Sequence, residues 1–147
     1  MDKELDKAFE QAKEKLGSVN QDIEKLSKPV STLLLVYSAQ EVIDNGGYEY
    51  FFESIWTNNP PYSKFINAYH EIGCEKQAID FNRVALSFPF ENPHLNESSR
   101  EKYINDNYDE GEFEVKGWGD ALSGDEEVWA KLERYYVQNK ERFVQPK

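Results

Sequence analysis

Apolar residues recur at helical spacing along most of this chain. Leu5, Phe9, Ala12 and Leu16 stand three or four positions apart with charged residues between them. This spacing predicts an amphipathic helix over residues 1–16 that ends at Gly17-Ser18. A short helical stretch follows, and Pro29 suits the first turn of the next helix.

Residues 30–44 are apolar on nearly every side of a helix, which is typical of a buried central helix. Asn45-Gly46-Gly47 then interrupts the pattern. Glycine adopts positive φ at little cost, so we expect one of these two glycines to hold a positive φ in a tight turn.

Three further apolar stripes follow the double glycine. The first predicts a helix whose core-facing stripe consists of Tyr48, Phe51, Phe52, Ile55 and Trp56. Tyr50 lies off this stripe. Pro60-Pro61 ends this helix. The other two stripes, within residues 65–72 and 78–88, predict two more helices, which end at Gly73 and Pro89.

The last third of the chain has a different pattern. Residues 90–124 show weak periodicity, which predicts a long surface excursion with one short helix near residues 99–107. The last helix is predicted over residues 125–143, with acidic residues at its start, where the helix dipole favours negative charge. The whole chain, 1–147, is therefore expected to be one all-α, compact, multi-helix domain of about seven helices, with a long acidic loop region before the last helix.

Composition sets the class of protein. The chain has 147 residues, of which 39% are hydrophobic and 14% aromatic, too much core material for a disordered protein. Its one cysteine, Cys74, cannot close an intramolecular disulfide, and no metal-finger spacing is present, so we expect no metal and no cofactor. No signal peptide and no apolar run near the ~20 residues of a membrane span are visible, which favours a cytoplasmic protein.

Charge is concentrated in one part of the chain. The formal net charge is −11, which argues against direct binding to nucleic acid or to an acidic membrane. Residues 91–127, here called the acidic segment, hold 12 acidic and three basic residues, whereas residues 128–147 hold two acidic and five basic ones. The acidic segment is either a solvated loop or a carboxylate array that imitates phosphates and occupies a basic groove on a partner.

The candidate partner-binding residues all lie in the acidic segment. Trp118, between two glycines, could anchor a partner or pack into the core. The full candidate set is Asp106, Asp109, Glu110, Glu112, Glu114, Trp118, Asp120, Asp125, Glu126 and Glu127.

Catalytic patterns are weak. Cys74 and His70 are four residues apart, but no triad order, phosphate loop or zinc-protease motif accompanies them. Glu49 and Glu53 are i,i+4 neighbours that could bind a cation, although a solvated surface pair is the simpler interpretation. We therefore expect no catalytic residues.

The stretch Asn45-Gly46-Gly47-Tyr48-Glu49-Tyr50-Phe51-Phe52 resembles a bacterial DNA-mimic protein family of helical proteins. Two other parts are similar to it: Ile72-Gly73-Cys74 with the helix that follows, and the last helix from Tyr135-Tyr136 to Phe143. No counterpart is found for residues 91–124. The resemblance implies an acidic surface, on a homodimer, that binds a DNA-binding protein and displaces DNA.

The leading hypothesis is a non-catalytic acidic binding protein, in the form of a DNA mimic that blocks a DNA-binding protein or transcription factor. One alternative is an immunity or inhibitor protein against a basic toxin or nuclease, which would need a shaped anchor such as Trp118. Another is a small enzyme with a pocket around Asn45 and His70. The partner expected under the first two hypotheses is a basic protein.

Overall fold

The computed structural model describes residues 3–144. Its α-helices in chain order are α1 Lys3–Ser18, α2 Lys28–Glu53, α3 Tyr62–Glu71, α4 Glu75–Ala85, α5 Glu97–Asn107, α6 Glu126–Gln138 and α7 Glu141–Val144. The minor elements are the 3₁₀ helices η1 Ile23–Lys25 and η2 Pro93–Leu95 and the strands β1 Tyr108–Asp109 and β2 Glu114–Val115. The prediction of an all-α fold with about seven helices is confirmed.

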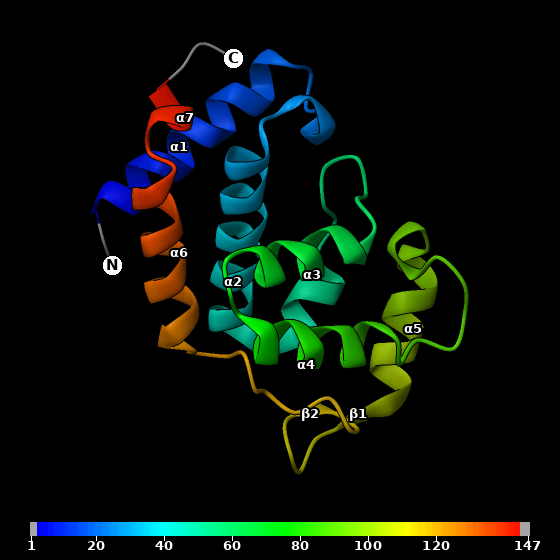
Figure 1. Cartoon of the computed structure of the whole chain (residues 1–147). Helices are drawn as coiled ribbons and strands as arrows, with labels where there is room; N and C mark the ends of the chain where they lie inside the picture. Colours follow the sequence, from blue (N-terminus) through cyan, green and yellow to red (C-terminus); the bar gives the residue numbers. More distant parts are fainter. Residues whose placement is uncertain (1–2, 145–147) are drawn as a thin grey trace.

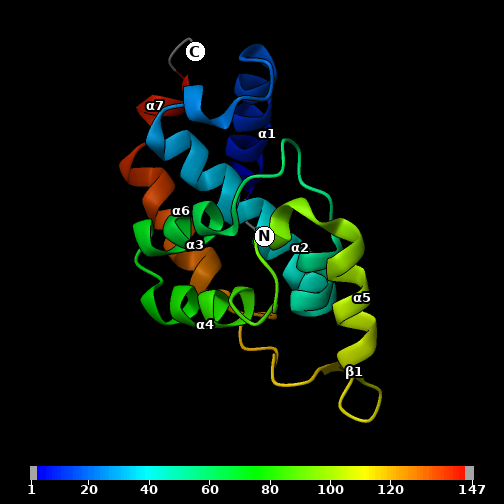
Figure 2. The same ribbon diagram turned by 90° about the vertical axis from the view of Figure 1, so that its right-hand side faces the viewer.

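Helix α2 forms the centre of the fold, with α1, α3, α5 and α6 packed around it (Figure 1). Its residues from Val30 to Tyr37 are buried except Ser31, as expected for a helix that is apolar on nearly every side. Figure 2 shows α3 and α4 stacked on one side of α2 and α5 on the other. No helix of the described part is long and apolar enough to cross a membrane.

The double glycine bends α2 as predicted. Gly47 has φ +75° and ψ −172°, a conformation that only glycine adopts readily, whereas Gly46 is extended with φ −163°. The bend turns the last residues of α2 into the core, where Tyr48, Phe51 and Phe52 are fully buried. One glycine of the pair therefore holds a positive φ, and it is the second.

The predicted stripe after the double glycine is only partly correct. Helix α2 ends at Glu53, before the stripe is complete. Ile55 consequently lies on the surface with 68% of its area exposed, and Trp56 is half-buried, its indole Nε1 donating a 3.2 Å hydrogen bond to the carbonyl oxygen of Phe51. The helix stops early because Arg100 of α5 donates hydrogen bonds to the carbonyl oxygens of Phe52, at 2.7 Å, and Ser54, at 3.3 Å. These carbonyls therefore need no further helical partners.

The prediction of a long surface excursion over residues 90–124 is only partly correct, because most of these residues are exposed but a few return to the core. The region holds α5, as expected, but also the two-stranded hairpin β1–β2, in which Tyr108 lies opposite Val115. After the hairpin the chain returns to the core, where Val115, Trp118 and Leu122 are each at most 1% exposed. Their three- and four-residue spacing is embedded in a glycine-rich, acidic sequence, which masked it.

The last predicted helix is divided in two. It begins as expected, with Asp125 as its N-cap, because the Asp125 carboxylate accepts a 2.9 Å hydrogen bond from the backbone N–H of Glu127. It ends at Gln138 and a new short helix, α7, starts at Glu141. This break brings Phe143 back onto Tyr136, with ring centroids 5.0 Å apart.

Candidate partner-binding surface

Arg83 of α4 holds part of the backbone of the acidic segment in place. The guanidinium of Arg83 donates hydrogen bonds to two successive carbonyl oxygens, those of Gly117 at 2.6 Å and Trp118 at 2.7 Å. Asp80, one helical turn earlier, accepts from Arg83 Nε at 3.1 Å and orients the group. Hydrogen bonds from a charged donor are stronger than neutral ones, so this contact fixes the backbone of the acidic segment just after the hairpin.

Polar side chains of α2 hold the acidic segment at three more points. The buried Gln40 donates to the carbonyl oxygen of Leu122 at 2.6 Å and accepts from the Tyr69 hydroxyl at 2.9 Å. Asp44 accepts from the backbone N–H of Gly124 at 2.8 Å. Glu49 accepts from the backbone N–H of Val115, also at 2.8 Å. The segment between the hairpin and α6 is therefore tied to the centre of the fold along its length.

Four of the candidate carboxylates are already engaged within the protein. Asp106 pairs with Lys102 at 2.8 Å, and Asp109 accepts from the backbone N–H of Gly111 at 2.9 Å. The N-cap Asp125 also accepts from Gln77 at 3.1 Å. Hydrogen bonds from Gln77 and Lys131 to Glu127 lower the pKa of its carboxyl group. These groups shape the surface and are less available to a partner.

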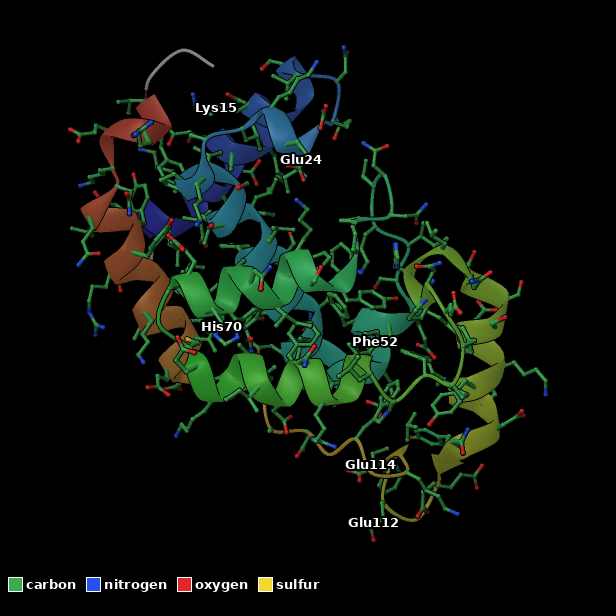
Figure 3. The ribbon with its side chains drawn as sticks, turned by 45° about the vertical axis from the view of Figure 1, so that its right-hand side comes forward. Lys15, Glu24, Phe52, His70, Glu112 and Glu114 are labelled. Carbon is green, nitrogen blue, oxygen red and sulfur yellow. The ribbon has the colours of Figure 1, made fainter. Side chains whose placement is uncertain are left out.

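Five candidate carboxylates have no such engagement. Among residues 3–144, no side-chain hydrogen bond or ion pair is formed by Glu110, Glu112, Glu114, Asp120 or Glu126. All are exposed except Glu114, which is partly buried. Figure 3 shows Glu112 at the outer end of the hairpin and Glu114 closer to the helices. Asp120 and Glu126 therefore present unpaired negative charge beside a backbone that Arg83, Gln40 and Asp44 hold in place, whereas Glu110 and Glu112 lie at the turn of the hairpin.

Trp118 is not an exposed anchor. Its side chain is 1% exposed, its ring lies against Phe52 and Phe88 with centroids 5.3 and 5.7 Å away, and its Nε1 donates a 2.8 Å hydrogen bond to the Ser87 hydroxyl. Of the two possibilities that the sequence left open for Trp118, the structure shows the second, an indole packed into the core. An indole whose N–H can reach a partner inside the core gains more from burial than from exposure.

The two residues considered for catalysis, His70 and Cys74, differ in burial. His70 Nδ1 lies 2.6 Å from the carboxylate of Glu75, on the surface side of α3. Cys74 is fully buried, and this burial raises the pKa of its thiol to about 11. In residues 3–144 no group of three or more His, Cys, Asp or Glu side chains could hold a metal ion.

Three exposed aromatic residues lie beside the unpaired carboxylates. Sequence reasoning left Tyr50 off the core-facing stripe but missed the other two, Tyr108 and Phe113. Tyr50, Tyr108 and Phe113 are 54%, 42% and 79% exposed. Phe113 has φ +57°, an uncommon value for a bulky residue. For Phe113 the sequence held one signal of exposure. It lies in a run of acidic residues and has no apolar neighbour at helical spacing before it.

The family of the chain follows from a comparison with family models. The model of the DMP19-like proteins matches residues 24–140, which include the whole acidic segment as well as the double-glycine region. This match confirms the resemblance carried by residues 45–52. Neither a curated protein nor a solved structure matches the chain. The chain belongs to the DMP19-like protein family, a family of DNA mimics.

Proposed function

We propose that this protein is a non-catalytic DNA mimic whose acidic segment occupies the basic groove of a DNA-binding protein. The partner is a basic protein that otherwise holds DNA, such as a transcription factor. The proposal includes a cytoplasmic location, where such partners act, and the homodimer that the family resemblance implies.

The observation that carries the proposal is the combination of free carboxylates and a fixed backbone. Glu112, Asp120 and Glu126 are exposed and unengaged among the described residues. The chain between them is held by Arg83 and Gln40. DNA presents its phosphates on a stiff scaffold, and a mimic that is already ordered loses less conformational entropy on binding than a flexible acidic tail. Membership of a DNA-mimic family supports the same interpretation.

The uneven distribution of charge also favours a directed surface. The acidic segment carries 12 of the 28 acidic residues and three of the 17 basic ones. A concentrated field of one sign steers an oppositely charged partner to that face and raises the association rate. A protein that needed negative charge only for solubility would gain as much from an even distribution.

The inhibitor alternative loses the anchor that the sequence suggested for it. It needs a shaped, exposed anchor such as Trp118, and Trp118 lies in the core. A DNA mimic has no such requirement, because exposed carboxylates at the surface are sufficient for contact with a basic groove.

The test compares two variants of equal net charge. The segment variant combines Glu112→Gln, Glu114→Gln, Asp120→Asn and Glu126→Gln. The control variant removes four exposed carboxylates outside the acidic segment, by Glu10→Gln, Glu14→Gln, Glu41→Gln and Glu141→Gln. Each protein is immobilised, and proteins captured from the native cell extract are eluted with duplex DNA and identified.

A DNA-binding protein should be captured by the wild type and by the control variant, released by DNA, and lost from the segment variant. Equal capture by both variants would show that overall charge, rather than this segment, is recognised. Capture of proteins that DNA does not release would contradict the proposal.

A further inference from the structure

A groove of about 440 Å³ lies between the end of α2, helix α5 and the β1–β2 hairpin. Two kinds of side chain form its walls. The aromatic wall consists of Tyr50, Tyr108 and Phe113, and the carboxylates are those of Glu49, Glu53 and Glu110. No lysine or arginine of the described chain lines it. The groove thus combines apolar ring surface with uncompensated negative charge.

The aromatic wall is open to a partner. Phe113 and Tyr50 have more than half of their area exposed, and a large ring gains little from water contact at the surface. The faces of such rings carry partial negative charge and attract a cation that lies over them. The same rings offer apolar area to the flat side of a guanidinium group.

The carboxylates repel one another in the absence of a cation. Burial raises the pKa of the Glu53 carboxyl, and the nearby carboxylates of Glu49 and Glu101 raise it further. Neither Glu53 nor Glu110 forms a side-chain hydrogen bond or an ion pair among residues 3–144. An incoming positive group would relieve this repulsion and find free acceptor oxygens.

A larger pocket elsewhere on the molecule lacks this selectivity. It measures about 560 Å³ and lies between the end of α1, η1 and the loop before α3. Lys13 and Lys64 line it together with Asp22 and Glu24, so its charges are balanced. Its lining does not favour a ligand of either sign.

We propose that the groove beside the hairpin receives an arginine side chain of the partner protein. This inference rests on the proposed function and adds an anchor point to it. Arginine fits better than lysine because its planar guanidinium stacks on aromatic rings while it donates paired hydrogen bonds to a carboxylate. A partner arginine that otherwise binds a DNA phosphate is thereby bound by the carboxylates of the groove. The aromatic rings add a contact that DNA phosphates do not offer.

Two substitutions probe the groove without touching the core. Phe113→Ser removes a ring that is 79% exposed, and Glu53→Gln removes a charge with little change in shape. Their controls lie outside the groove lining. They are Leu86→Ser, at the 74% exposed C-cap of α4, and Glu14→Gln on α1. Circular dichroism should be the same for all four variants and the wild type.

The first experiment titrates the full chain with N-acetyl-arginine amide and follows backbone amide signals by nuclear magnetic resonance. Saturable shifts should appear at Glu49, Tyr50, Glu53 and Phe113, with N-acetyl-lysine amide binding more weakly. Phe113→Ser and Glu53→Gln should each weaken arginine binding about threefold to fivefold, the factor expected for an exposed cation–π or ion-pair contact. The controls should bind as the wild type does.

Three results would overturn the assignment: no saturable shifts at the groove, equal binding of the lysine and arginine amides, or unchanged binding in both groove variants. The second experiment repeats the partner capture with these variants. If the wild type captures a DNA-binding partner that DNA releases, and both groove variants capture it equally well, the groove inference fails while the proposed function stands. If no such partner is captured, the proposed function fails, and the arginine titration alone decides whether the groove binds a guanidinium.

Discussion

Arg83 of α4 and Trp118 of the acidic segment are joined by a 2.7 Å hydrogen bond from the guanidinium to the backbone carbonyl oxygen. The two residues stand 35 positions apart in the chain. Their contact places a positive charge beneath a stretch of negative ones. It neutralises little of the exposed surface, because it is directed at the backbone, and it holds that backbone in position.

Replacing Arg83 by Gln should therefore weaken partner binding, although it makes the protein more negative. If only charge mattered, the loss of a positive group would strengthen binding to a basic partner. Loss of the two carbonyl contacts should cost about 1 kcal/mol locally and raise the hydrogen exchange of residues 116–122 roughly fivefold. Arg134→Gln on α6 has the same charge change and is the control. Tighter binding by Arg83→Gln would show that the segment needs no support.

Trp118→Ala should destabilise the fold strongly. The indole is fully buried against Phe52 and Phe88, so its removal should lower the free energy of unfolding by about 3–5 kcal/mol in urea denaturation. Phe113→Ala, in the same segment but exposed, should change it by less than about 0.5 kcal/mol. A small effect of Trp118→Ala would mean that the segment is not packed on the core.

Substitution of each of the two glycines of α2 should destabilise the protein, but for different physical reasons. Gly47→Ala places a side chain at φ +75°, which should cost about 1–3 kcal/mol of unfolding free energy in any background. The φ of Gly46 is open to other residues, but the Cβ of an alanine at this position would overlap the ring of Tyr50. In a Tyr50→Ala background the cost of Gly46→Ala should therefore largely disappear, while that of Gly47→Ala stays. A double-mutant cycle by thermal unfolding checks this, and equal coupling at both sites would refute it.

The Cys74 thiol should be unreactive in the native protein. Burial raises its pKa from an ordinary 9.0 to about 11, which lowers the thiolate fraction near pH 8 about 100-fold. Between pH 9 and about 11 the thiol ionises in the unfolded chain but stays protonated in the native protein. The free energy of unfolding should therefore fall as the pH rises through this range. Iodoacetamide labelling at pH 8 should follow global unfolding in urea. Fast labelling of the folded protein would point to an accessible, activated thiol.

Local sequence patterns were sufficient for most helices and insufficient for the contacts between them. The stripes within residues 65–72 and 78–88 became α3 and α4, because an amphipathic helix needs only its own periodicity to be recognised. Ile55 was misplaced because Arg100, which satisfies carbonyls at the end of α2, lies 46 residues after Ser54. No window of local sequence contains both partners.

The candidate surface was predictable in composition but not in detail. Counting charges located the acidic segment correctly, since net charge is a property of the sequence. It could not separate Glu126, which is free among the described residues, from Glu127, which accepts from Gln77 some 50 positions away. Charge counting also could not show whether Trp118 is exposed or buried, because glycines on both sides of a tryptophan are compatible with either state.

Displacement of DNA tests the central claim most directly. A fluorescent DNA duplex is bound to the captured partner, and its anisotropy is followed as the protein is added at several salt concentrations. The wild type should release the DNA, and its own affinity should fall steeply with salt because exposed charges are screened within about 8 Å at physiological ionic strength. The segment variant should need roughly tenfold more protein, at about 0.3–0.5 kcal/mol for each exposed charge removed, and the control variant should match the wild type. DNA that stays bound while the protein binds beside it, or equal potency of the two variants, would contradict the account.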